Sequence, residues 1–178
     1  MPTLHVHLDE SGNLTFKPSG SRYYVFTAAW TYDPAPLGGA LTALRFALLK
    51  QGHDLHRFHA TEDKQVNRDA VVAALARHET WRFAAVVIEK AKVYPDLRVP
   101  HRFYPEFASS VLKHVFRRHL VPGTDTVLVF TGTLRILALP LVHILIIFLH
   151  LSRPSVLSCA SGMVVLRQKR EDPDRAPA

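Results

Sequence analysis

The sequence predicts an α/β protein in which helices flank a mixed β-sheet. Strand-like and helix-like segments alternate as far as about residue 131. Apolar residues make up 48% of the chain and charged residues 21%, which is typical of a globular protein and argues against disorder. A chain of 178 residues is long enough for one domain with a hydrophobic core.

Four segments have the composition of β-strands. In residues 3–9 apolar and polar side chains alternate, so the apolar ones share one face and Asp9 lies on the other. A Ser-Gly-Asn turn then ends this strand, because Gly and Asn tolerate turn conformations. Residues 22–32, 81–89 and 127–131 are rich in β-branched and aromatic residues, and we expect the last of these to be the final strand.

Three segments have the spacing of helices. Over residues 37–50 apolar side chains recur every three or four positions, at Leu37, Leu41, Leu44 and Leu48. Residues 66–78 and 102–119 show similar patterns, and the last has an apolar stripe with basic residues on its other faces. Residues 51–64 are expected to form a polar loop, and residues 96–100 a turn.

The overall charge favours an anionic partner. The formal net charge is +7 and the isoelectric point is near 9.9, and nucleic acid is the commonest partner of such proteins. A single cysteine, Cys159, excludes an internal disulfide. Because acidic residues come too early for a secretory leader, we expect a cytoplasmic location.

The charge pattern changes near residue 125. Twelve acidic residues precede this point, whereas none occurs from Thr126 to Arg170. The same interval contains an apolar run, Leu134 to Leu151, interrupted by Arg135, Pro140, His143 and His150. A membrane-spanning helix needs about 20 mostly apolar residues. A buried or misplaced segment is therefore favoured over a transmembrane helix.

Three polar clusters lie at predicted strand ends or in adjoining loops: Asp9 with Glu10; His59 with Glu62, Asp63 and Arg68; and Glu89 with Lys90. Hard divalent cations such as Mg²⁺ prefer carboxylate oxygens. Two such ions flanking a phosphodiester can activate a water and stabilise the leaving oxygen. His59 could shuttle a proton, because the pKa of histidine lies near neutrality.

Each cluster also has a simpler interpretation. The carboxylates of Glu62 and Asp63 precede a predicted helix and could serve its amino terminus. Glu89 followed by Lys90 is an ordinary way to end a strand, and a lone His59 is more often a surface residue than a catalytic one. The basic residues of helix 102–119 could form a solvated face. Only the combination of all three clusters with the positive charge favours catalysis.

Five segments together resemble the domain of unknown function 3800 family: HLDESGN, RFHATEDKQVNRD, FAAVVIEK, FYPEFASSVLKHVFRRHL and VLVFTGTL. The resemblance covers roughly residues 4 to 134. It implies a ribonuclease-H-like fold and a metal-dependent nuclease whose substrate is unproven. It also implies a functional role for Asp9 and Glu10, for the loop residues His59, Glu62 and Asp63, and for Glu89 with Lys90.

The chain departs from this family at its carboxyl-terminal end. Similar sequences usually have an Asp where this chain has Gly132, and they continue into a basic helix, a His-containing strand and a helix with a Gln-x-x-Asp element. None of these follows Leu134. We therefore expect a ribonuclease-H-like domain over residues 1–133, incomplete at its end, followed by an atypical segment over 134–178. A reading-frame slip is favoured over a membrane anchor.

Three functions follow as hypotheses. The first is a nuclease-like domain that uses Mg²⁺ or Mn²⁺ to cleave DNA or RNA, and that could be inactive in this form. Asp9 would be its main metal ligand, and the further ligands or water activators would be Glu10, Glu62, Asp63 and Glu89. Phosphate would meet Arg68, Lys90, Arg117 and Arg118. The second is a nucleic-acid-binding module without turnover. The third is a membrane-associated protein anchored through residues 134–151.

Overall fold

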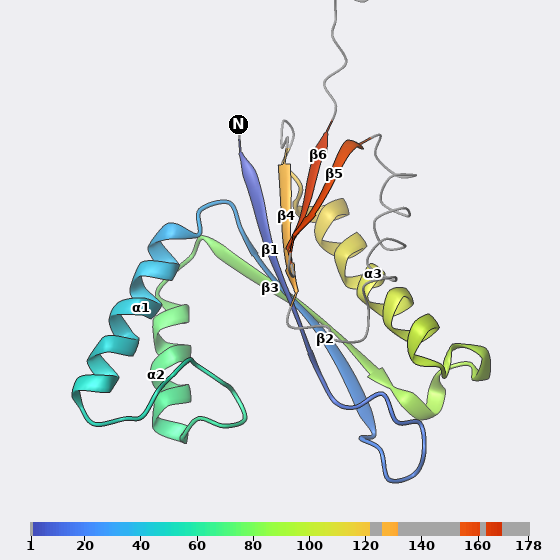
Figure 1. The fold of residues 1–178 in the computed structure, drawn as a ribbon, viewed down its shortest axis with the longest axis horizontal. Coiled ribbons are helices and arrows are strands. Elements are labelled where there is room, and N and C mark those ends of the chain that lie inside the picture. Colours follow the sequence, from blue (N-terminus) through green and yellow to red (C-terminus); the bar gives the residue numbers. More distant parts are fainter. Residues whose placement is uncertain (1, 122–125, 132–153, 161–162, 169–178) are drawn as a thin grey trace, which may run out of the picture. The chain divides into compact units, whose positions relative to one another are not determined.

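The computed structural model describes residues 2–121, 126–131, 154–160 and 163–168. The chain divides into two compact units, one formed by Met1–Trp30 with Phe83–Ala178 and the other by Thr31–Arg82. The first unit contains a mixed β-sheet and one long helix, and the second is a helical hairpin (Figure 1). The predicted α/β class is confirmed.

Seven elements match those that the sequence predicts, and their bounds differ from the predicted ones by two residues at most. The strands are β1 (Thr3–Ser11), β2 (Tyr23–Thr31), β3 (Trp81–Glu89) and β4 (Thr126–Thr131). The helices are α1 (Ala35–Lys50), α2 (Gln65–Ala76) and α3 (Pro100–His119). Two short 3₁₀ helices, Lys90–Lys92 and Pro95–Leu97, connect β3 to α3.

The expectation that β4 is the final strand is wrong. Two further strands follow it, β5 (Pro154–Ala160) and β6 (Met163–Gln168), which pair with each other in antiparallel fashion. Whether a short segment forms a strand depends strongly on the strand that it pairs with, so these two strands could not be recognised from local composition alone. The predicted boundary between residues 133 and 134 lies outside the described residues and stays a prediction.

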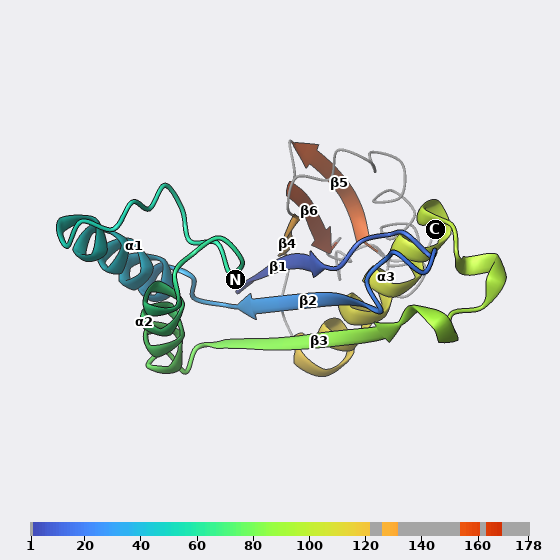
Figure 2. The same ribbon diagram turned by 90° about the horizontal axis from the view of Figure 1, so that it is seen from below.

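The six strands form one sheet in the order β3-β2-β1-β4-β6-β5. Strands β1, β2 and β3 alternate in direction (Figure 2). Strand β4 runs parallel to β1, with Leu8 opposite Thr131, and antiparallel to β6. Because of these directions, the carboxyl ends of β1, β3 and β4 lie at the same end of the sheet.

Helix α3 covers one face of this sheet and forms the core with it. Its buried side chains are Phe103, Tyr104, Ala108, Ser109, Val111, Leu112 and Val115. The Phe103 ring meets Tyr24 of β2 edge to face at 5.3 Å, and the Tyr104 ring meets Phe26 at 4.9 Å. On β1, Leu4 and Val6 are fully buried, as the alternating pattern predicts.

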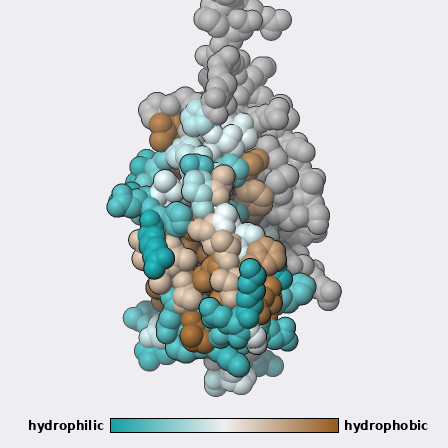
Figure 3. All heavy atoms as spheres, turned by 90° about the vertical axis from the view of Figure 1, so that its left-hand side faces the viewer, coloured by the Kyte–Doolittle hydropathy of each residue, from teal (hydrophilic) through white to brown (hydrophobic). Residues whose placement is uncertain are grey.

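The helical hairpin is closed at its base by two hydrogen bonds. Thr31 Oγ1 donates to the Thr80 backbone oxygen at 2.9 Å, and Trp81 Nε1 donates to the Leu75 backbone oxygen at 2.8 Å. Large apolar side chains are exposed on its helices, with Phe46 55% and Val72 63% exposed. Figure 3 views the molecule from the left-hand side of Figure 1 and shows brown apolar patches among teal polar ones.

Candidate functional site

The structure places two of the three predicted polar clusters at one end of the sheet. Asp9 and Glu10 are near the carboxyl end of β1, and Glu89 and Lys90 are at the carboxyl end of β3. Both strands end there because β2, which lies between them, runs in the opposite direction (Figure 2). This end of the sheet is therefore the candidate site of the first unit.

Asp9 and Glu10 leave β1 on opposite faces. The burial pattern of β1 alternates, so that Asp9 shares the exposed face with His7 and Glu10 lies on the side of α3. Asp9 is exposed and Glu10 is half-buried. Burial, together with the neighbouring Asp9 charge, raises the pKa of Glu10 above its ordinary value. Within the described residues no ion pair joins either carboxylate to a basic side chain.

The Glu10 carboxylate influences two buried phenols, Tyr104 and Tyr24. The Tyr104 hydroxyl donates a long hydrogen bond of 3.5 Å to Glu10 Oε2. Burial and the negative charge of Glu10 raise the pKa of Tyr104, and the same causes raise the pKa of Tyr24 to about 12. The sequence prediction missed both residues. The sequence does place Tyr104 next to Phe103, which belongs to the apolar stripe of the predicted helix. A tyrosine buried there needs a hydrogen-bond partner for its hydroxyl.

Glu89 is already engaged in two ion pairs. Its Oε1 lies 3.0 Å from Arg22 Nη2, and its Oε2 lies 2.8 Å from Lys92 Nζ. The hydrogen bonds from Lys92 and Arg22 lower the pKa of Glu89 below its ordinary value. Both oxygens would have to exchange these partners to bind a metal ion.

Lys90 is buried, and its ammonium contacts the turn between β1 and β2. Its Nζ donates to the backbone oxygens of Asn13 and Thr15 and to the side-chain oxygen of Asn13. Burial lowers the pKa of Lys90 below its ordinary value. Its three N–H donors are therefore all accepted within the turn, and the roles of Lys90 in catalysis and in phosphate binding stay predictions.

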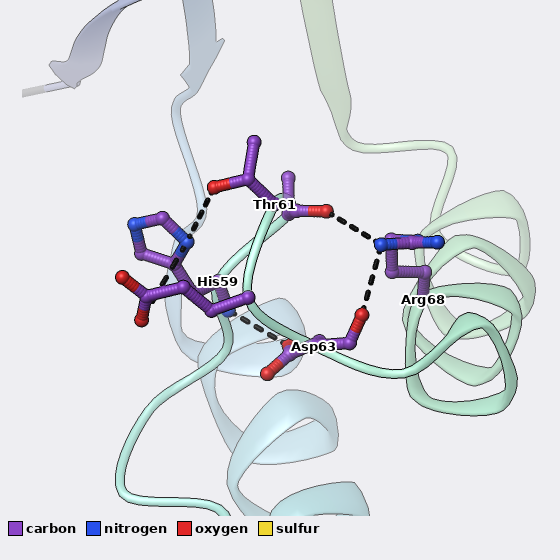
Figure 4. A network of polar contacts seen from close by, with 6 residues as sticks. His59, Thr61, Asp63 and Arg68 are labelled. Carbon is purple, nitrogen blue, oxygen red and sulfur yellow. Dashed lines mark hydrogen bonds and ion pairs between the residues drawn. The ribbon is translucent and has the colours of Figure 1, made fainter.

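The third cluster lies in the helical hairpin and forms a compact loop of its own (Figure 4). The Asp63 carboxylate accepts the backbone N–H of His59 at 2.8 Å, and the backbone N–H of Asp63 donates back to the His59 oxygen at 2.9 Å. His59 Nδ1 lies 3.1 Å from Thr61 Oγ1 and 3.9 Å from Glu62 Oε2. The described contacts of His59 therefore fix both its backbone and its ring.

Arg68 closes this loop from helix α2. Its Nη1 donates to the backbone oxygens of Ala60 and Asp63, at 3.1 and 2.8 Å, and its Nη2 donates to Gln65 Oε1 at 2.6 Å. The Asp63 carboxylate does not cap α2, because the amino-terminal cap of that helix is Lys64, which makes no side-chain cap bond. The carboxylate instead holds His59.

Arg117 and Arg118 lie at the other end of α3 from Tyr104. They are exposed in the last turn of the helix, where the neighbouring His119 ring packs against Trp30 at 4.7 Å. Thirteen residues of helix separate Tyr104 from Arg117, a rise of about 20 Å. These two arginines are therefore not brought to the end of the sheet that carries Asp9.

A row of stacked rings covers the face of β1 that carries Asp9. His7 pairs with Phe130 of β4 in the sheet, and their rings stack at 4.6 Å with an angle of 11°. The His5 ring lies 6.2 Å from Phe130 and is nearly parallel to it. Burial and the neighbouring His5 lower the pKa of His7 below its ordinary value. The sequence prediction missed this row.

The described residues contain no group of three or more His, Cys, Asp or Glu side chains placed to hold a metal ion. The exposed Asp9 nevertheless has the oxygen chemistry of a magnesium ligand, since Mg²⁺ is commonly held by one or two carboxylates and keeps several waters. Gly132 and the apolar run 134–151 lie outside the described residues. None of the helices that the structure describes is long and apolar enough to cross a membrane.

Comparisons with protein-family models, with curated proteins and with solved structures found no match for this chain.

Proposed function

We propose that this chain is a divalent-metal-dependent, nuclease-like domain of the domain of unknown function 3800 type, with a ribonuclease-H-like fold. The order β3-β2-β1-β4, with β4 parallel to β1, is compatible with that fold. One observation carries the proposal. Asp9 and Glu10 are adjacent carboxylates at the end of a central strand, and no basic side chain in the described part of the chain neutralises them.

Asp9 and Glu10 differ in what they can do. Asp9 is exposed, so it is the residue that would hold a Mg²⁺ or Mn²⁺ ion with room for its waters. Glu10 is fixed from the side of α3 by Tyr104 and adds a second negative charge close by. The chemistry that such an ion supplies when bound is polarisation of a phosphate oxygen and activation of a water. Glu62, Asp63 and Glu89 remain predicted ligands, and His59 a predicted proton shuttle.

The test is Asp9→Asn in the purified full chain. We expect this variant to lose both Mn²⁺ binding and metal-dependent cleavage of labelled DNA and RNA, in single-stranded and duplex forms. Asp96→Asn is the matched control, because Asp96 is an exposed carboxylate of the same unit that pairs with Arg102 at 3.6 Å. Unchanged cleavage by Asp9→Asn would reject the assignment.

A second candidate function, nucleic-acid binding without turnover, is favoured by the ring row of His5, Phe130 and His7. Aromatic rings on an open strand face can stack with bases, and each stacked base contributes about 1–3 kcal/mol. The net charge of +7 would add an electrostatic contribution that weakens with salt.

Phe130→Leu tests this second function. It should weaken the binding of a fluorescent single-stranded oligonucleotide in EDTA by about fivefold or more, which corresponds to the loss of about 1 kcal/mol or more of stacking. Tyr94→Ala is the control, because Tyr94 is 75% exposed and lies outside the sheet. Absence of binding at low salt would exclude the binding module.

A further inference from the structure

Lys90 is a buried lysine that makes all its described polar contacts with neutral oxygens. It is 5% exposed. Its Nζ donates to the Asn13 backbone oxygen at 2.9 Å, to Asn13 Oδ1 at 3.2 Å and to the Thr15 backbone oxygen at 2.7 Å. The Phe16 ring centre lies 5.7 Å from the same nitrogen. An ammonium has three N–H donors, and three oxygens of the turn accept them.

Such an arrangement is unusual for a lysine. Lysines are almost never fully buried unless they are paired with an opposite charge, because removing the ammonium from water is costly. The adjacent carboxylate, Glu89, is bonded instead to Arg22 and Lys92. Three oxygens and an aromatic face therefore surround Lys90 Nζ as they would surround a bound cation.

Asn13, which accepts two of these bonds, organises the turn between β1 and β2. Its Oδ1 also accepts the backbone N–H of Thr15 at 3.1 Å and of Ser21 at 3.3 Å. Its own N–H donates to Ser21 Oγ at 3.0 Å. The two sides of the turn are thus joined through one amide oxygen, and Lys90, the first residue of the 3₁₀ helix after β3, donates a hydrogen bond to that oxygen.

We propose that Lys90 is a positioning residue, a tethered cation that fixes the turn of residues 12–22 and thereby the end of β1 that carries Asp9 and Glu10. Glu10 is only three residues from Asn13, so a turn without fixed hydrogen bonds would also loosen the backbone that carries the Asp9 and Glu10 carboxylates. The inference goes beyond the nuclease-like function, because the turn would be held in the same way whether or not Asp9 binds a metal.

The experiment removes the side chain and replaces it with a soluble amine. In Lys90→Ala, the amide hydrogens of Asn13, Thr15 and Ser21 should exchange with solvent about 10- to 100-fold faster than in the native chain, as expected for lost bonds to a charged group. Added n-propylammonium should restore slow exchange, because it supplies the three carbons and the charge that the substitution removes. The probe n-propanol supplies the same carbons with a neutral hydroxyl and should not restore it.

Two further variants make the result decisive. Lys90→Met keeps most of the stem without the charge and should show the same fast exchange even if Lys90→Ala does not fold. Lys92→Met is the matched control, since Lys92 is 80% exposed and should leave the three amides unchanged. Native exchange in Lys90→Met, or equal rescue by n-propanol, would overturn the proposal. No metal or nucleic acid enters this readout, so its failure is distinct from failure of the Asp9→Asn test.

Discussion

The Tyr104 hydroxyl lies 3.5 Å from Glu10 Oε2, although 94 residues separate the two along the chain. This contact joins the first turns of α3 to the end of β1. It places a buried phenol against a carboxylate whose pKa is raised by burial and by Asp9. The acidic end of β1 is therefore part of the packing of α3 as well as a candidate metal site.

The first prediction concerns Glu10→Gln. Because the pKa of Glu10 is raised in the folded state, its ionisation opposes folding as the pH rises through that pKa. Glu10→Gln removes this penalty, so at pH 7 it should stabilise the chain by up to about 1 kcal/mol, a modest value because water screens the half-exposed group. The gain should shrink as the pH falls to 4. Urea unfolding at both pH values measures it, and an equal gain at both would contradict the stated cause.

The second prediction concerns alkaline stability. The pKa of Tyr24 is about 12, above its ordinary value, so between pH 10 and 12 the unfolded chain loses a proton that the folded chain keeps. Stability should therefore fall in this interval by up to about 1.4 kcal/mol per pH unit for this one group. Tyr24→Phe should flatten the fall by that amount. A slope identical to that of the native chain would show that the phenol ionises freely when folded.

The third prediction concerns Gly12 in the turn after β1. Its φ is +104°, and a Cβ there would lie 2.6 Å from the Tyr23 backbone oxygen. Gly12→Ala should therefore destabilise the chain by about 1–3 kcal/mol. Gly39→Ala is the control, because nothing lies within 4 Å of a Cβ at that helical position and the change should stabilise by about 0.5–1 kcal/mol. Opposite signs are expected in thermal unfolding.

The fourth prediction separates ion pairing from metal binding at Glu89. Glu89→Gln should change the unfolding midpoint only slightly, because both partners, Arg22 and Lys92, are exposed, and the change should fade in high salt. Mn²⁺ affinity should change less than in Asp9→Asn. Isothermal titration of both variants compares them, and an equal loss of affinity would make Glu89 a ligand of equal importance.

Much of the fold follows from local pattern. The alternation around Leu4, Val6 and Leu8 predicts both strand β1 and the exposure of Asp9, because a strand has a period of two. The turn at Gly12 is also predicted from residue type. Within the described residues no residue other than glycine has positive φ, so Asn13 acts there through its hydrogen bonds rather than through its backbone.

The rest depends on distant parts of the chain. Nothing near Glu10 in the sequence indicates Tyr104, since their contact arises only when α3 packs on the sheet. Lys90 was predicted to meet phosphate from its place beside Glu89 at a strand end, and its burial under the turn between β1 and β2 could not be read from that position. The stack of His7 on Phe130 likewise depends on the register of β1 with β4.

The hydrogen bond between Thr31 and Thr80 has a consequence for shortening the chain. It joins the two ends of the segment between β2 and β3, which are neighbouring antiparallel strands that a tight loop of a few residues could connect. Replacement of residues 32–79 by such a loop should therefore leave both strand ends in place.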